Sequence, residues 1–463
     1  MSDAASRDMT RLPAPLAVRG LASPPEGEGR LCGHDDPPYL RPVNHFDLQH
    51  GELHAESILL TAIAAAVGTP TYVYSAATLR RHFRVYRDAF AWGGGTVAYA
   101  VKANGNLSVL KVLAAEGAGA DTVSEGEIRR ALAAGVPPGR IIFSGMGKTD
   151  AELRFALSRP GLQINVESAP ELERLSSLAA AAGARPIVVF RVNPGVGAGG
   201  HAKITTGQAH DKFGVGLDEA IDLYRRAHDD PWLDPRGVGC HIGSQITELA
   251  PFKAAWTVMR DLVSLLRGEG LPVSRVDLGG GLAVPYFNHP EPPPPADLGA
   301  LARRMLDGMG LEVSVEPGRA IAANAGVLLS RVVQANRRAG GGPTFLVLDA
   351  AMNDLLRPTL YDAHHEICPV VPRTGEARPY DVVGPVCESG DTFARDRLLP
   401  PLQAGDLVAF LSAGAYGAAM ASEYNSRPLA AEVLVDGDRW AVVRPRPTYD
   451  EMLGRETAAD WLG

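Results

Sequence analysis

Cysteine is scarce in this chain. Only four cysteines occur in 463 residues, and no two of them have CxxC spacing. So few cysteines exclude a disulfide-based scaffold at this length and predict a reduced, cytoplasmic protein without a cysteine-type metal site. The N-terminus also lacks the basic start and apolar core of a secretory signal.

Long apolar runs and an excess of positive charge are missing as well. No run approaches the roughly 20 apolar residues needed to span a bilayer, so we expect no membrane partner. Lys and Arg number 45 against 53 Asp and Glu, a net charge of −8, whereas a nucleic-acid-binding protein is usually basic. Hydrophobic residues make up 46% of the chain, enough to fold, and the length suggests a large barrel with a smaller partner domain.

The chain divides into four predicted segments. Residues 1–42 are rich in Pro, Gly and Ser without periodicity, which predicts a disordered N-terminal extension. Residues 43–70 contain an extended stretch that we expect to join a C-terminal β domain. Residues 71–325 are predicted to form an α/β domain and residues 326–463 the mostly β domain, a sandwich or barrel.

Short apolar runs alternate with amphipathic stretches throughout residues 71–325, which predicts strands alternating with helices. The predicted strands are Thr96–Ala103, Ala120–Ser124, Ile141–Ser144, Gln163–Glu167, Ile187–Asn193, Gly237–Ile242, Arg275–Leu278 and Glu312–Glu316. An open doubly wound sheet would give the same alternation with fewer strands. Eight strands over about 250 residues favour a (β/α)8 TIM barrel.

After about residue 325 the alternation stops and strand-like runs dominate. They are Thr344–Leu348, Val382–Val386, Leu407–Leu411, Ala431–Val435 and Trp440–Val443. The last two runs flank Asp436-Gly437-Asp438, which is typical of a hairpin turn. The C-terminal part is therefore predicted to be a β domain.

Reactive side chains follow several of the predicted barrel strands, at the end where barrel enzymes carry their chemistry. Lys102 lies at the end of the first predicted strand, between Val101 and Ala103. A desolvated lysine has a lowered pKa and becomes a nucleophile toward aldehydes. The alternative is a lysine at the barrel rim whose amine reaches solvent.

The later strands supply groups suited to a flat, anionic cofactor. The glycines Gly279–Gly281 expose backbone N–H groups that can bind phosphate, aided by the Ser244 hydroxyl, although most such runs are simple turns. Glu316 can face a protonated ring nitrogen, and Arg319 can bind phosphate or a carboxylate; a strand-end ion pair is the alternative. His241 can stack on a ring or be a buried core histidine. Together these groups predict a pyridoxal 5′-phosphate (PLP) site.

At these residues the sequence resembles the fold type III, alanine-racemase-like PLP decarboxylases, and among them the diaminopimelate decarboxylase family. The similar stretches are Tyr99–Asn104, Cys240–Gln245, Asp277–Gly281, Glu316–Arg319, Met352–Tyr361, Gly384–Asp391 and Gly414–Gly417. The similarity runs from about residue 45 to the C-terminus. Small departures at Ala351, at residues 198–208 and in the Pro-rich loop near residue 293 affect no group expected to take part in catalysis.

The resemblance implies a role for each site residue. Lys102 would hold PLP covalently, His241 would stack on its ring, and Glu316 would pair with the ring nitrogen. The remaining cofactor contacts would come from Ser244, Gly280, Gly281, Pro317, Gly318, Arg319 and Tyr416. The substrate would be bound by Arg319, Arg357, Tyr361, Glu388 and Tyr416.

Cys387 would be the proton donor that acts after CO2 leaves. In the family this cysteine and Glu388 come from the neighbouring subunit, so the resemblance implies a homodimer with shared active sites. An inert buried thiol is the alternative for Cys387, but its polar neighbours favour an exposed loop.

The resemblance implies decarboxylation of meso-2,6-diaminopimelate at its D centre to L-lysine and CO2, the last step of lysine biosynthesis. A sibling PLP decarboxylase with a different or carrier-linked amino acid as substrate is one alternative. A non-catalytic PLP-binding homologue is another, and it has no need for Lys102, Cys387, Glu388 and Tyr416 together.

Overall fold

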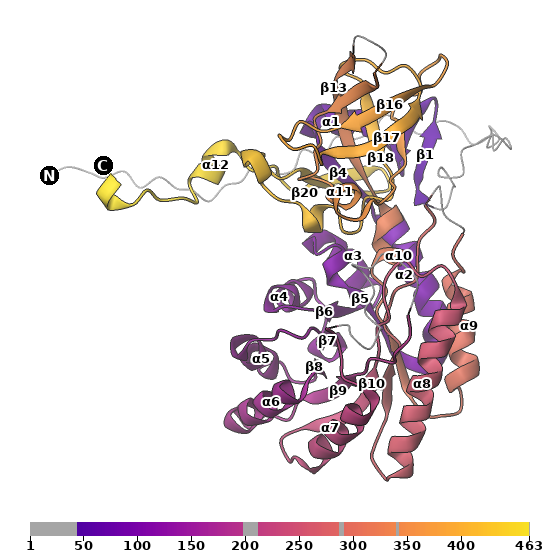
Figure 1. The fold of residues 1–463 in the computed structure, drawn as a ribbon, viewed down its shortest axis with the longest axis vertical. Helices are drawn as coiled ribbons and strands as arrows, with labels where there is room; N and C mark the ends of the chain where they lie inside the picture. The colour runs from indigo at the N-terminus through magenta and orange to yellow at the C-terminus, as the bar shows by residue number, and fades with distance from the viewer. Residues whose placement is uncertain (1–43, 198–211, 287–290, 339–341, 463) are drawn as a thin grey trace.

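The computed structural model describes residues 44–197, 212–286, 291–338 and 342–462. The predicted disordered extension, residues 1–42, and the variable segment at residues 198–208 lie outside the described residues. The described chain forms two lobes, an α/β lobe and a β-rich lobe, with the C-terminus on an arm that leaves the β-rich lobe (Figure 1).

The α/β lobe is a closed barrel of eight parallel strands, as predicted. Around the barrel each strand pairs with the next, and the last strand closes onto the first. The strands are β5 (Gly94–Ala100), β6 (Gly119–Thr122), β7 (Ile141–Phe143), β8 (Gln163–Val166), β9 (Ile187–Arg191), β10 (Asp234–Gly239), β11 (Arg275–Asp277) and β12 (Glu312–Val315). The TIM-barrel prediction is therefore confirmed.

Helices alternate with the strands and cover the outside of the barrel (Figure 1). They are α2 (Ala76–Phe90), α3 (Leu107–Ala115), α4 (Glu125–Ala133), α5 (Asp150–Leu157), α6 (Ala169–Ala182), α7 (Leu217–Asp229), α8 (Leu249–Gly268) and α9 (Pro295–Leu306). Local sequence fixes several ends: Ser124 caps α4 by accepting from the Glu127 N–H, and Gly183 ends α6 in the left-handed conformation.

The β-rich lobe is built on a nine-stranded sheet. Seven strands follow the order β17-β16-β14-β13-β4-β19-β20, while β15 and β18 attach through β13. The strands are β4 (Thr71–Ser75), β13 (Gly326–Arg337), β14 (Thr344–Leu348), β15 (Ile367–Pro369), β16 (Arg378–Val383), β17 (Thr392–Leu399), β18 (Leu407–Phe410), β19 (Ala431–Asp436) and β20 (Arg439–Arg444). Four of the five strands expected in this part are present, whereas the expected Val382–Val386 overlaps only the last two residues of β16. The Asp436–Asp438 turn joins β19 to β20.

The expected position of the N-terminal strand needs correction. The strand that enters the large sheet is β4, between β13 and β19, and all five of its residues are buried. The barrel therefore begins at α2, five residues later than expected. The earlier strands β1 (Phe46–Gln49), β2 (Glu52–Ala55) and β3 (Ile58–Leu59) form a small sheet of their own. This sheet packs on the β-rich lobe through an apolar cluster that includes Leu53 and Val327.

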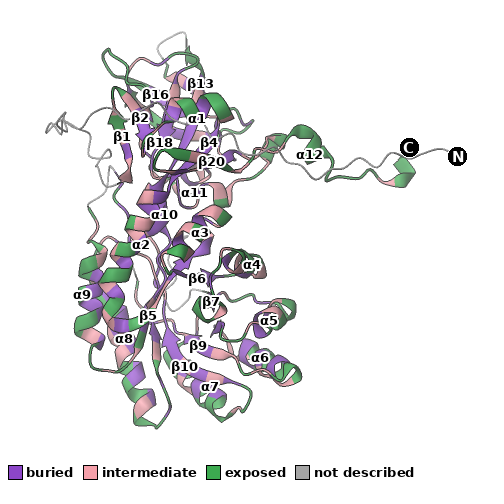
Figure 2. Cartoon of the chain, turned by 180° about the vertical axis from the view of Figure 1, so that it is seen from behind, coloured by how far each residue is buried: buried purple, intermediate pink, exposed green. Residues whose placement is uncertain are grey.

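The carboxyl ends of the barrel strands face the β-rich lobe (Figure 1). Buried positions continue from the strands through α10 (Arg319–Ala322) into that lobe (Figure 2). Functional groups at the strand ends can therefore meet groups from the β domain. In the described part of the chain, no helix combines the length and apolar character needed to cross a bilayer.

Candidate active site

A cavity of about 310 Å³ lies at the carboxyl ends of the barrel strands. Three residues of the predicted site line it: Lys102, His241 and Glu316. Its remaining polar lining consists of Asp121, Ser144, Asn165, Arg191 and Asp277. The volume falls at the lower end of the range for small-molecule sites, about 300–1,000 Å³.

Lys102 forms an ion pair inside this cavity. It lies in a single 3₁₀ turn directly after β5, and its Nζ donates to Oδ2 of Asp121 at 2.5 Å. Burial alone would lower the pKa of Lys102, but the charges of Asp121, Tyr416 and Glu316 raise it above its ordinary value. The expectation of a lowered pKa for Lys102 is therefore wrong, because the neighbouring negative charges, with Asp121 first among them, outweigh desolvation.

Glu316 belongs to a buried cluster of carboxyl groups. Burial and the negative charges of Asp121 and Asp277 raise the pKa of Glu316 well above its usual range. Burial also raises the pKa of Asp277 to about 6. Such a cluster favours a cation placed against it, because a positive charge would offset both desolvation and repulsion.

His241 is held next to the glycine turn by a backbone hydrogen bond. The Gly280 N–H donates to Nδ1 of His241 at 3.2 Å. Burial and the positive charges of Arg191 and Lys102 hold the pKa of His241 well below its ordinary value, so the ring is neutral. A neutral, flat imidazole lining the cavity suits stacking on an aromatic ligand.

The Gly279–Gly281 turn is closely packed. A Cβ on Gly279 would lie 2.2 Å from the carbonyl oxygen of Cys240, and one on Gly280 would lie 2.2 Å from that of Glu316. Gly279 and Gly281 also have positive φ. The backbone here can therefore approach its neighbours, or an anion, more closely than any other residue type allows.

Arg319 connects Ser244 with Tyr416 of the β domain. It lies at the start of α10, and its Nε and Nη2 donate to Oγ of Ser244 at 3.4 and 3.3 Å. Its guanidinium carbon lies 4.8 Å from the centre of the Tyr416 ring. The preceding residues Pro317 and Gly318 pack beside β5, where the Ala100 N–H donates to the Pro317 carbonyl at 3.1 Å.

Arg357 comes from the β domain, and its side chain and that of Arg319 both contact the Tyr286 hydroxyl. It begins α11 (Arg357–Tyr361), and Tyr361 ends the same helix. The Nη1 atoms of Arg357 and Arg319 donate to the Tyr286 hydroxyl at 3.1 and 3.2 Å. The two arginines predicted to bind one carboxylate are thus brought together.

Cys387 and Glu388 are not in the cavity lining of their own chain. They lie in the loop between β16 and β17, and both are exposed. The loop is ordered by side chains: the Cys387 N–H donates to Oδ1 of Asn425 at 3.0 Å, and both Met352 and Val386 donate N–H groups to Asp391. The inert buried thiol is thereby ruled out for Cys387.

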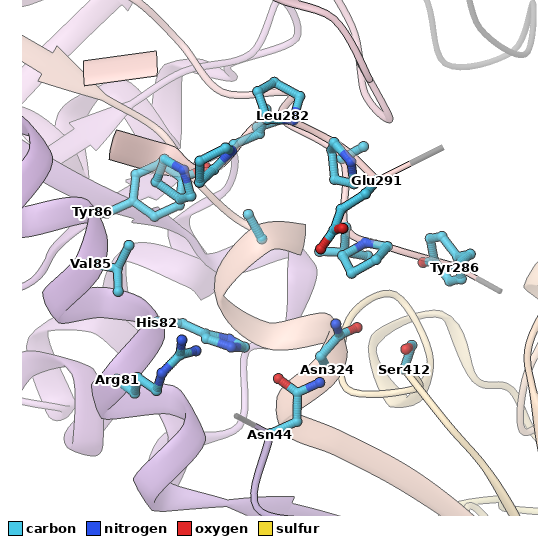
Figure 3. A pocket seen from close by; sticks show the side chains of 18 of the residues that line it. Asn44, Arg81, His82, Val85, Tyr86, Leu282, Tyr286, Glu291, Asn324 and Ser412 are labelled. Carbon is cyan, nitrogen blue, oxygen red and sulfur yellow. The ribbon is translucent and has the colours of Figure 1, made fainter. Parts of the chain in front are cut away.

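Tyr286 also lines a second, larger cavity of about 770 Å³. Figure 3 shows side chains from α2, including Arg81 and His82, on one side of it and Asn324 and Ser412 on another. None of the residues predicted for the active site lines it.

Comparison with known proteins identifies the family. The profile of the family described as pyridoxal-dependent decarboxylase, pyridoxal binding domain, matches residues 76–323. The diaminopimelate decarboxylase of Zymomonas mobilis is 47% identical over 90% of this chain and 99% of its own length. That of Pseudomonas aeruginosa is 48% identical, again over 90% of this chain and 99% of its own length. This chain belongs to the diaminopimelate decarboxylase family.

Solved structures of the diaminopimelate decarboxylase family agree with the fold. The Helicobacter pylori enzyme, described as complexed with L-lysine, is 40% identical, with a TM-score of 0.81 over 85% of this chain and 98% of its own. A lysine/ornithine decarboxylase from Vibrio vulnificus is only 26% identical, with a TM-score of 0.71 over 81% of this chain and 96% of its own. Both the fold and the sequence identity therefore support membership of the diaminopimelate decarboxylase family.

Residues of this diaminopimelate decarboxylase family member fit PLP. Lys102 supplies an amine for the aldehyde, and the carboxyl cluster around Glu316 suits a protonated ring nitrogen. Among the described residues, the buried Oδ1 of Asp121 has no hydrogen-bond partner, which leaves an acceptor for a ligand. The glycine turn has no room for side chains, and its backbone N–H groups would suit a phosphate.

Sequence reasoning missed seven polar residues of the site. They are Asp121, Ser144, Asn165, Arg191, Asp277, Tyr286 and His365. Asp121 and Asp277 fall inside predicted strands, and their position at a strand end was a signal that could have found them. Tyr286 and His365 lie in loops without any pattern that marks them.

Proposed function

We propose that this protein decarboxylates meso-2,6-diaminopimelate at its D centre, with PLP as cofactor, to give L-lysine and CO2. The identity of 47–48% to diaminopimelate decarboxylases over 90% of the chain is the observation that carries this proposal. The paired guanidiniums of Arg319 and Arg357 support it further, because the substrate has a carboxylate at its non-reacting end.

Bound PLP supplies an electron sink for the pair released when the bond from Cα to the carboxylate breaks. Lys102 holds the cofactor, His241 packs against its ring, and Glu316 keeps the ring nitrogen protonated. Ser244, Gly280, Gly281 and the segment Pro317–Arg319 would hold its phosphate, and Tyr416 would add a further contact to the cofactor.

The residues that bind the non-reacting end of the substrate, here called the distal clamp, select between its two ends. Arg319, Arg357 and Tyr361 hold the carboxylate of the L centre, and Glu388 binds its ammonium. A diamine-type amino acid such as ornithine has no distal carboxylate and would leave two buried guanidiniums without an anion. Tyr416 contacts both cofactor and substrate.

The protein acts as a homodimer in this proposal. Cys387 and Glu388 are exposed and absent from the cavity of their own chain, which supports their contribution to the partner's site. Cys387 delivers the proton to Cα once CO2 has left. We also propose a cytoplasmic location, because an exposed catalytic thiol requires a reducing environment.

The test is release of L-lysine from meso-diaminopimelate by the purified PLP-loaded protein, followed by chromatography. We expect lysine from this substrate and no product from ornithine or arginine. A protein that shows bound-cofactor absorbance but releases no lysine would instead be a sibling decarboxylase with another amino acid as substrate.

A further inference from the structure

The hydroxyl of Tyr286 lies between two cationic side chains. It accepts from Nη1 of Arg319 at 3.2 Å and from Nη1 of Arg357 at 3.1 Å. All three side chains are buried, with exposed fractions of 7% for Tyr286, 7% for Arg319 and 4% for Arg357. Two buried cations repel each other, and a phenol oxygen that accepts from both holds them at a fixed separation.

His365 provides a second acceptor for Arg357. Its Nδ1 lies 2.9 Å from the carbonyl oxygen of Leu411, so this nitrogen carries the hydrogen. Its Nε2 is then free to accept, and it lies 2.9 Å from Nη1 of Arg357. The ring also meets Tyr286 edge-on, with centroids 6.0 Å apart and an interplanar angle of 84°.

His365 keeps this role over the whole physiological pH range. Burial and the charge of Arg357 lower the pKa of His365 to about 3. The charged groups of Arg319 and His364 act in the same direction, whereas the bond to Leu411 opposes it. The imidazole therefore remains a neutral acceptor.

These contacts leave one edge of Arg357 for a ligand. Both hydrogens of Nη1 are used, one by Tyr286 and one by His365. Nε is buried and has no hydrogen-bond partner among the described residues. An arginine binds a carboxylate best through two parallel N–H groups, and the Nε–Nη2 edge offers such a pair.

Arg319 is engaged differently. Its Nε and Nη2 already meet the Ser244 hydroxyl, and its Nη1 meets Tyr286. Its planar group lies over the Tyr416 ring. Arg319 is thus held between the predicted phosphate site and Tyr286, while the buried Nε of Arg357 has no hydrogen-bond partner among the described residues.

We propose that Tyr286 and His365 are positioning residues that turn the Nε–Nη2 edge of Arg357 toward the carboxylate at the substrate's non-reacting end. The proposal deepens the proposed function and rests on it, because it requires a substrate with a distal carboxylate. Arg357 is the principal ligand of that carboxylate, and Tyr286 sets its distance from Arg319.

Binding of two small molecules to the PLP-loaded protein tests this assignment. L-lysine carries the distal carboxylate and cadaverine lacks it. We expect Tyr286→Phe and His365→Met to weaken L-lysine binding about tenfold, the scale of one hydrogen bond to a charged group, without changing cadaverine binding. His365→Gln, which keeps an acceptor, should restore most of the affinity.

Tyr380→Phe is the matched control, because Tyr380 is a buried tyrosine of β16 whose hydroxyl accepts from the Leu402 N–H. With diaminopimelate, Tyr286→Phe should raise KM much more than it lowers kcat. Calorimetry gives the affinities, and the melting temperature and bound-cofactor absorbance report any general disruption.

Two results would overturn the assignment in distinguishable ways. A wild-type protein that binds L-lysine no better than cadaverine overturns the proposed substrate and the clamp together. A wild-type preference for L-lysine that persists in both Tyr286→Phe and His365→Met overturns only the positioning role. In an L-lysine complex, a carboxylate within hydrogen-bond distance of Nε of Arg357 supports the proposal, and one bound elsewhere contradicts it.

Discussion

The Nζ of Lys102 lies 2.5 Å from Oδ2 of Asp121, and both residues of this ion pair line the cavity at the barrel mouth. Asp121 is almost fully buried, with an exposed fraction of 1%. The pair favours the protonated form of the lysine, although an amine must be neutral to attack an aldehyde. Uptake of PLP therefore has to overcome this interaction.

Asp121→Asn should speed PLP uptake by the cofactor-free protein near neutral pH. The substitution removes a buried charge that raises the pKa of Lys102, so a larger fraction of the amine is neutral. The gain is about tenfold for each unit by which the pKa falls. Stopped-flow absorbance over a pH series measures the rate. Asp381→Asn, a buried aspartate of β16, is the control, and an unchanged rate in Asp121→Asn would contradict the account.

Asp277 should make the stability of the cofactor-free protein depend on pH. Its pKa is raised from 3.8 to about 6, so the folded state binds a proton that the unfolded chain has lost. Its contribution to stability is therefore fully present below pH 4 and lost as the pH rises through 6. Melting temperatures of wild type and Asp277→Asn measure it: the variant should gain stability relative to wild type between pH 4 and pH 7. A constant difference across this range would count against the shifted pKa.

Gly280→Ala should impair both the fold and cofactor binding. The added Cβ would lie 2.2 Å from the carbonyl oxygen of Glu316, and overpacking of this kind costs about 1–3 kcal/mol. We expect a lower melting temperature and loss of PLP on gel filtration. Gly268→Ala is the control, because a Cβ there meets nothing within 4 Å. PLP retention equal to wild type in Gly280→Ala would show that the turn does not bind the phosphate.

Mixing two inactive variants should restore activity if active sites are shared. Lys102→Ala lacks the amine, and Cys387→Ala lacks the proton donor while keeping the fold, because the thiol is exposed. Half of randomly paired dimers are mixed, and each of these has one intact site of two, so roughly a quarter of wild-type activity should return. Mixed dimers seen by native mass spectrometry without activity would mean that both residues serve the same chain's site. Full activity of Cys387→Ala alone would exclude the proton-donor role.

Much of the architecture could be predicted because it depends on local patterns. All eight barrel strands follow from alternating apolar runs and helix caps, such as Ser124 with Glu127. The strand β4 was missed because its apolar sequence does not show which sheet it joins. Its partners β13 and β19 lie more than 250 residues away in the chain, as the pairing of Thr71 with Leu329 shows.

The site was predictable where residue type alone limits the chemistry. Lys102, His241 and Glu316 meet in one cavity as expected. The direction of the pKa shift of Lys102 was mispredicted because it depends on the buried Asp121, which lies 19 positions further along the chain. Tyr286 could not be found at all, because its importance comes from two arginines that reach it from different domains.

The most direct test of the central claim uses meso-diaminopimelate labelled with ¹³C in one carboxylate. One preparation carries the label at the D centre and the other at the L centre, and the PLP-loaded protein is incubated with each. The D label should leave as ¹³CO2, and the L label should stay in lysine. Label released equally from both centres, or only from the L centre, would contradict the claim that Arg319 and Arg357 hold the L-centre carboxylate.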